Sequence, residues 1–261
     1  MSIEFSKLPK TEYQYNVELL KQEDESFVKA YELAVNADPR LADVIIHSNE
    51  ENDQTDLTKE FRPSYFAEKP WETESGKPEI YVLLAGGDKS ILSYQIDEGS
   101  VGLEQMVSLA NSVDIHNFDP AKNVKLFKVF MLLHELGHAK DFFDNMDKSD
   151  DYDKVVEKAW QEWNVPYKKY VDKRNNLFQK WNAEYMATVA NISSFANRED
   201  YAAALDNVCS KYEIVMKNIV TPDPKEMDRK YVEMPHEKFA DNFAKKTLTN
   251  NPDFLMSLIN N

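Results

Sequence analysis

The feature that most constrains this chain is the place where its glycines stop. All six lie between Gly76 and Gly137, and none occurs in the remainder of the 261 residues. Glycine costs a helix interior about 1 kcal/mol relative to alanine. The glycine-free part is rich in Leu, Lys, Glu and Ala, which favour helix. We therefore expect a mostly helical C-terminal half.

A small sheet is predicted before that boundary. Glu79–Ala85 is the best strand candidate and is closed by two glycines, and Ser90–Ile96 follows after a short turn, which predicts a hairpin. If one of these strands lies at a sheet edge, it can pair with an extended peptide. The expected class is α+β, with an N-terminal helical and loop region at 1–75 and one domain at 76–261.

Capping residues and apolar residues at helical spacing predict the helices. Asp119-Pro120 supplies an N-cap and a first-turn proline, so a helix should begin there and continue to Asp144. Ser149 should open another helix, and Pro166 should end it and start the next. Further helices are expected at about Glu23–Asn36, Val101–Asn111, Glu199–Val220 and Pro235–Leu248.

Charge and composition exclude several classes of protein. The net charge of −15 disfavours binding to phosphate backbones, so no nucleic-acid partner is expected. No apolar run approaches the ~20 residues that cross a bilayer. The first residues lack a secretory signal, so a cytoplasmic protein is expected, although a toxin or effector exported without a cleaved signal would read the same. The single cysteine, Cys209, rules out a Cys-rich zinc module.

The motif that carries chemistry is His134-Glu135-Leu136-Gly137-His138, an H-E-x-x-H inside a predicted helix. Residues four apart share a helix face, so both imidazoles can reach one metal ion. Glu135 is then placed to act as general base on a water that zinc activates. With five histidines in the chain the pattern can also arise by chance, but its helical context favours metal binding.

A catalytic zinc site needs a third protein ligand. The pattern H-E-x-x-H-x-x-G-x-x-H is excluded, because Asp141 and Asp144 occupy its glycine and third-histidine positions. Glu237, in the first turn of the predicted helix after Pro235, is the stronger candidate. Asp241 is placed one turn later to accept the second N–H of a zinc-bound histidine. The alternative is that both acids form a solvated helix face.

These residues resemble a known group of enzymes. His134–His138 with Glu237-x-x-Ala240-Asp241 looks like the gluzincin zinc metallopeptidases, and HELGHAKDF with the residues around Glu237 is similar to the anthrax-lethal-factor-like endopeptidases. The resemblance implies a zincin-like fold with an active-site helix, and zinc held by His134, His138 and Glu237. It also implies that Tyr231 stabilises the oxyanion.

The number of residues between His138 and Glu237 is about twice that expected of the family. A helical insertion at about 149–220 would account for it. Glu184 sits nearer the expected spacing and also precedes an alanine by three residues, so it remains an alternative third ligand.

The expected function is therefore that of a zinc-dependent metalloendopeptidase acting on peptide or protein substrates. The alternative is a non-catalytic zincin-like module that senses a ligand or binds a protein partner. A third possibility is that His134 and His138 are core residues of a helical adaptor. Retention of Glu135 favours the enzyme, because a structural metal site does not need that carboxylate.

Overall fold

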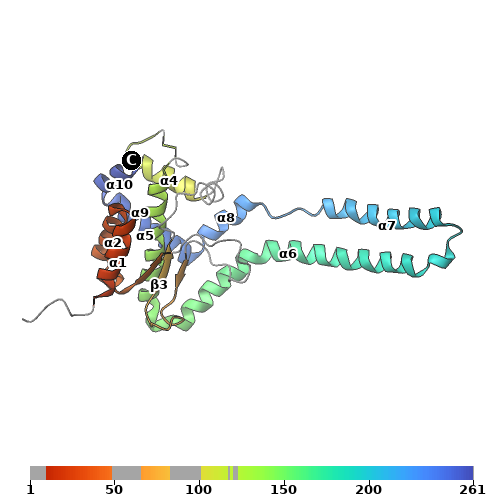
Figure 1. Cartoon of the computed structure of the whole chain (residues 1–261), viewed down its shortest axis with the longest axis horizontal. Helices are drawn as coiled ribbons and strands as arrows, with labels where there is room; N and C mark the ends of the chain where they lie inside the picture. The colour runs from red at the N-terminus through yellow and green to blue at the C-terminus, as the bar shows by residue number, and fades with distance from the viewer. Residues whose placement is uncertain (1–9, 49–65, 83–100, 117, 120–122, 261) are drawn as a thin grey trace, which may run out of the picture. The chain divides into compact units, whose positions relative to one another are not determined.

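The computed structural model divides the chain into two compact units (Figure 1). The first comprises Met1–Glu157 and Tyr231–Asn261, and the second comprises Lys158–Lys230. The described part of the chain is mostly helical and has one three-stranded mixed sheet, which is consistent with the predicted α+β class. The described residues are 10–48, 66–82, 101–116, 118–119 and 123–260.

The sheet has the strand order β1-β3-β2. β1 (Ile45–Ser48) runs parallel to β3 (Glu79–Val82), and β2 (Phe66–Glu68) runs antiparallel to it. Ile46 and Ile80 are partners in register and are buried together. The sheet therefore turns one apolar face toward the helices of the first unit.

The strand predicted at Glu79–Ala85 is confirmed over Glu79–Val82, but β3 is the central strand. Because β3 is paired on both sides, it cannot pair with an added peptide as expected of an edge strand. β1 and β2 were not predicted, since both are too short to show a clear alternation. The predicted strand Ser90–Ile96 and its hairpin lie outside the described residues.

The helix predicted at about Glu23–Asn36 is confirmed, and a further helix that was not predicted precedes it. α1 (Glu12–Glu23) and α2 (Glu25–Ala37) are separated by Asp24, which has an extended backbone and caps α2 by accepting a hydrogen bond from Ser26 N at 2.7 Å. The short 3-10 helix η2 (Pro39–Asp43) leads from α2 into β1. A capping side chain at 24 can end one helix and start the next, which apolar spacing alone does not reveal.

The central helix of the first unit is α5 (Val124–Asn145), which carries the H-E-x-x-H motif. It packs against α2, the sheet and α9, so most of its side chains are buried. The predicted start at Asp119-Pro120 is wrong, and Pro120 itself lies outside the described residues. Asn123 caps the helix instead: its Oδ1 accepts from Leu126 N at 2.8 Å and its Nδ2 donates to Leu258 O at 2.9 Å.

Helix α9 (Pro235–Thr249) packs along α5 through a very close backbone approach. A β-carbon placed on Gly137 would lie 2.7 Å from Ala240 Cα and 2.9 Å from its carbonyl oxygen. The predicted helix at Pro235–Leu248 is thus confirmed. The glycine inside α5 has a physical reason, because the partner helix passes where a side chain would be.

Shorter helices complete the first unit. α4 (Val101–Asn111) has the predicted bounds and packs on α5 and α9. α10 (Pro252–Ile259) buries Leu255 and Leu258 against the core. The 3-10 helix η4 (Met146–Lys148) connects α5 to the next long helix.

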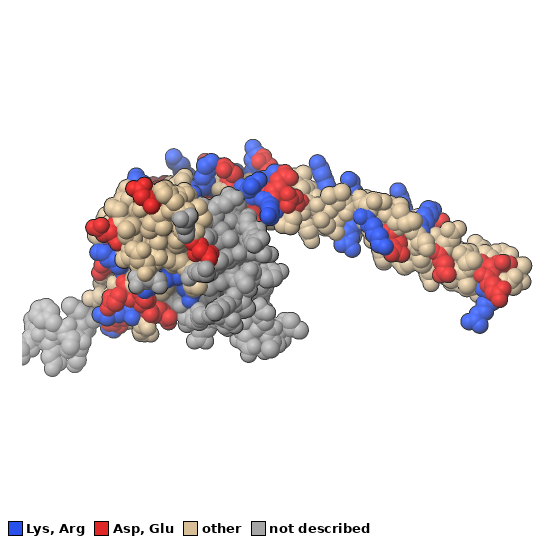
Figure 2. All heavy atoms as spheres, turned by 90° about the horizontal axis from the view of Figure 1, so that it is seen from above, with Lys and Arg blue, Asp and Glu red and all other residues tan. Residues whose placement is uncertain are grey.

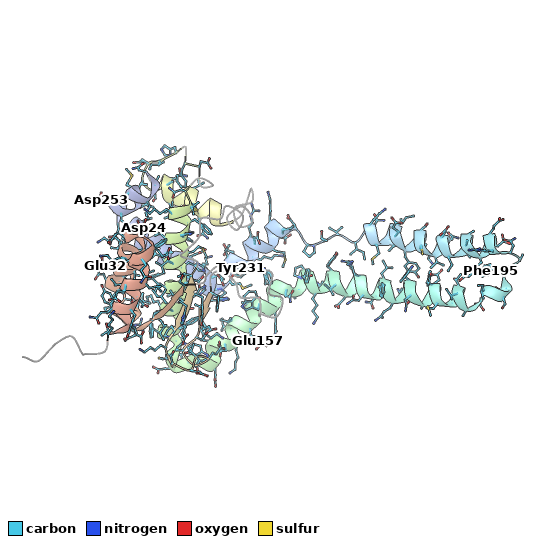
Figure 3. The ribbon with its side chains drawn as sticks, in the orientation of Figure 1. Asp24, Glu32, Glu157, Phe195, Tyr231 and Asp253 are labelled. Carbon is cyan, nitrogen blue, oxygen red and sulfur yellow. The ribbon has the colours of Figure 1, made fainter. Side chains whose placement is uncertain are left out.

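All secondary-structure elements of the second unit are helices. It contains most of α6 (Ser149–Ala190), the 3-10 helix η5 (Ile192–Ser194) near Phe195 (Figure 3), α7 (Arg198–Lys217) and most of α8 (Pro224–Val232). The predicted break at Pro166 is wrong, because α6 continues through it. Proline removes one hydrogen bond to the preceding turn, and a helix of this length retains the others.

Charges are mixed on the molecular surface. On the face shown in Figure 2, Lys and Arg are interspersed with Asp and Glu among the described residues. In the described part of the chain, no helix has an apolar stretch long enough to cross a membrane.

Substituting Gly137 with alanine tests the contact between α5 and α9. Alanine normally stabilises a helix interior by about 1 kcal/mol over glycine. Here the new methyl group meets backbone atoms that cannot rotate away, so we expect the free energy of unfolding to fall by about 1–3 kcal/mol in urea denaturation. Adding Ala240→Gly should not restore stability, because the obstructing atoms are main-chain. An increase in stability would contradict the close approach.

Candidate metal centre

Three side chains from two helices converge in the first unit. Nε2 of His134 lies 3.1 Å from Nε2 of His138, and Oε2 of Glu237 lies 3.4 Å from the former and 3.6 Å from the latter. All three residues are buried, and among the described residues they form the group that can hold a metal ion. The ligand atoms of a tetrahedral zinc site, with bonds of ~2.0–2.1 Å, lie about 3.4 Å apart. The observed spacings fit such a site.

The local sequence explains this convergence. His134 and His138 are four residues apart on α5 and therefore share the face that meets α9. Pro235 occupies the first turn of α9 and places Glu237 at the N-terminal end of that helix. Because α9 passes very close to α5 at Gly137, between the two histidines, the Glu237 carboxylate reaches both imidazoles.

Asp241 contacts His134 at Nδ1, the ring nitrogen that faces away from the cluster. Its Oδ1 accepts from Nδ1 of His134 at 2.8 Å, and its Oδ2 accepts from Nε2 of Gln105 on α4. With Nδ1 protonated, Nε2 of His134 is the nitrogen available to a metal ion. The predicted outer contact of Asp241 is present. Gln105 was not predicted, because a single polar residue in an apolar helix gives no motif.

The electrostatics of the cluster favour protonated histidine beside ionised carboxylate when no metal is bound. Burial alone would lower the pKa of His134, but hydrogen bonds to Asp241 and Glu237 outweigh it and raise the pKa to about 10. Burial would raise the pKa of Glu237, yet hydrogen bonds from His134 and His138 hold it well below its usual range. A metal cation that displaced the proton between His134 and Glu237 would be stabilised by the same carboxylates.

Glu135 is the buried acid next to the first histidine. Burial raises its pKa above the usual value for a glutamate, although the neighbouring histidines oppose the shift. Its Oε2 is buried and has no hydrogen-bond partner among the described residues. A buried carboxylate oxygen without a partner lowers stability, and a catalytic role is one explanation for keeping it.

Tyr231 lies in the last turn of α8, shortly before α9 (Figure 3). Burial and the nearby charge of Glu237 raise the pKa of its phenol, and its hydroxyl hydrogen-bonds to Glu237. Glu135 contributes to the same pKa shift. The predicted tyrosine is therefore neutral and lies beside the cluster.

The aspartates after the motif lie outside the cluster of three. Asp141 accepts hydrogen bonds from the Tyr152 hydroxyl at 2.9 Å and from Asn145 Nδ2 at 3.0 Å. Asp144 pairs with Arg40 and Lys140, each at 2.5 Å. The contacts of both acids therefore stabilise the structure around the C-terminal end of α5.

Glu184, the alternative third ligand, belongs to α6 in the second unit. Its carboxylate accepts from Lys211 Nζ and from the Tyr212 hydroxyl, both at 2.8 Å. It is not one of the three residues whose ligand atoms converge. The geometry therefore favours Glu237.

Two further residues differ in their exposure from what their types suggest. His236, a polar residue at the start of α9, is buried beside Glu237, with 3.4 Å between its Nε2 and Oε1 of that residue. Cys209, a residue type that is often buried, is exposed on α7. Residue type alone did not indicate either environment.

Comparisons of this chain with protein-family models, with curated proteins and with solved structures found no match. The interpretation of the site consequently depends on the geometry and chemistry of its own residues.

Metal content separates the two candidate third ligands. We expect about one zinc ion per wild-type chain purified without chelator, measured by elemental mass spectrometry. Glu237→Ala should lose most of this zinc because it removes one of three converging ligand atoms. Glu184→Ala is the matched control and should retain it. Retention by Glu237→Ala together with loss by Glu184→Ala would reverse the assignment.

Zinc binding should also depend on pH. Since the pKa of His134 is raised to about 10 in the metal-free protein, zinc must displace a proton from its Nε2 near neutral pH. The apparent affinity should rise by about tenfold per pH unit. Calorimetry in buffers of different ionisation enthalpy would detect the released proton. Heats that do not depend on the buffer would contradict this protonation state.

Proposed function

We propose that this chain is a zinc-dependent metalloendopeptidase of the gluzincin type, similar to the anthrax-lethal-factor-like endopeptidases and built on a zincin-like fold. The observation that carries the proposal is the position of Glu135. It is a buried carboxylate with one oxygen lacking a partner among the described residues, directly beside a His-His-Glu triad. A site that only stored or sensed a metal would not need this group.

The donor set suits catalytic zinc. Two imidazoles and one carboxylate are a common ligand set of hydrolytic zinc sites, and three protein ligands leave one position open. A zinc ion held there supplies Lewis-acid chemistry and activates water. His134, His138 and Glu237 would hold it, with Asp241 orienting His134 from the opposite side of the ring.

Glu135 would move the protons of the reaction. Its raised pKa brings the carboxyl closer to neutral pH, where a general base is most effective. It would accept a proton from the attacking water and then deliver that proton to the leaving amine of the peptide. Both transfers use the same oxygen that has no partner among the described residues.

Tyr231 would stabilise the negative charge that develops on the scissile carbonyl oxygen. Its raised pKa keeps the phenol protonated and able to donate a hydrogen bond. In the metal-free protein that hydroxyl hydrogen-bonds to Glu237. Substrate would take the place of this contact.

The decisive variant is Glu135→Gln, which keeps the size of the side chain and removes the base. We expect it to bind zinc as the wild type does and to lose peptide cleavage by about 100-fold or more. Cleavage is measured with a quenched fluorescent peptide library. Glu184→Gln makes the same chemical change outside the cluster and should cleave normally. Undiminished cleavage by Glu135→Gln would refute the mechanism.

The same assay distinguishes the enzyme from a non-catalytic zincin-like module. A wild type that binds zinc and cleaves no member of the library would support the module.

Tyr231→Phe tests the oxyanion role separately. Removing the hydroxyl should lower kcat by about 100-fold, with zinc content unchanged. Zinc content and steady-state kinetics are measured on the same preparation. An unaltered kcat would remove Tyr231 from the mechanism while leaving the role of Glu135 intact.

A further inference from the structure

Gln105 is a buried polar residue of α4 for which the proposed mechanism has no task. Its side-chain Nε2 donates to Oδ2 of Asp241, whose other oxygen accepts from Nδ1 of His134. We infer that Gln105 is a positioning residue of the metal site: it fixes the Asp241 carboxylate, which in turn fixes the ring of His134. This inference rests on the metal site proposed above.

The orientation of the Gln105 amide follows from chemistry. A carboxylate only accepts hydrogen bonds, so the amide nitrogen must face Asp241. This leaves Oε1 of Gln105 buried and without a hydrogen-bond partner among the described residues. An apolar side chain of similar size would fill the same space without that loss. The bond to Asp241 therefore explains the amide better than packing does.

The arrangement also accounts for the tautomer of His134. Asp241 meets one N–H donor at each of its oxygens, so its carboxyl group is held against rotation. Its Oδ1 then stays in line with Nδ1 of His134, and Nε2 stays directed toward His138 and Glu237. Without Gln105, Oδ2 would be left buried without this donor, and the carboxylate would be freer to rotate away from the imidazole.

Three helices meet in this relay, since α4 supplies Gln105, α9 supplies Asp241 and α5 supplies His134. Met106, the next residue of α4, is fully buried in the core and therefore anchors the same helix. It has no part in the hydrogen bonds of the relay. Comparing the two neighbours separates positioning of the metal site from stability of α4.

The experiment measures zinc affinity of the metal-free full chain by competition with a chromophoric chelator. Gln105→Met keeps an unbranched side chain and removes the donor. We expect it to weaken zinc binding by about 10-fold, the lower end of the range for partners of metal ligands. In an Asp241→Asn background the same change should add little, because both act through one contact. The visible spectrum of the cobalt-loaded protein should shift with each single substitution.

Met106→Ala is the matched control. It should lower stability in urea more than Gln105→Met does, and it should leave zinc affinity unchanged. Unchanged zinc affinity in Gln105→Met, or a loss that adds fully to that of Asp241→Asn, would overturn the role of Gln105 alone. A wild type that binds no zinc would overturn the metal site as well.

Discussion

Helices α5 and α9 pack so closely at Gly137 and Ala240 that a β-carbon on the glycine would overlap the opposite backbone. This approach sets the distance between the two histidines on one helix and Glu237 on the other. A displacement of about 1 Å at such a site is enough to impair catalysis. The metal centre therefore depends on a residue that makes no polar contact.

The close packing of α5 and α9 also buries several ionisable side chains together. Glu135, Glu237 and Asp241 are all buried, as are both histidines. Burying charges without partners is strongly unfavourable. In the metal-free state, close pairing of the histidines with Glu237 and Asp241 offsets part of this cost. A divalent cation is the partner that would neutralise the remaining charge, which links the stability of this region to metal binding.

The sequence was most informative where a motif and a helix coincide. His134, His138 and Glu237 were predicted as ligands, and the structure places all three together, because helical spacing fixes which residues share a face. The zinc ion, the peptidase activity and the division of the chain into domains stay predictions.

Other features depend on contacts between distant segments. The pairing of β1 with β3 joins Ile46 to Ile80, which are far apart in the sequence, and no local pattern specifies that partner. Asn123 replaced Asp119-Pro120 as the cap because a tertiary contact with Leu258 holds it in place. Gln105 escaped notice because its importance comes only from Asp241, which is remote in sequence.

X-ray absorption at the zinc edge of the metal-loaded full chain is the most direct test of the central claim. The account predicts that zinc is coordinated by two imidazole nitrogens and by carboxylate or water oxygens at ~2.0–2.2 Å. The more distant ring atoms of two imidazoles should contribute their characteristic scattering. In Glu237→Ala, any residual zinc should show a lower number of oxygen neighbours or a shell filled by water. A shell containing sulfur, or one without histidine, would contradict the site described here.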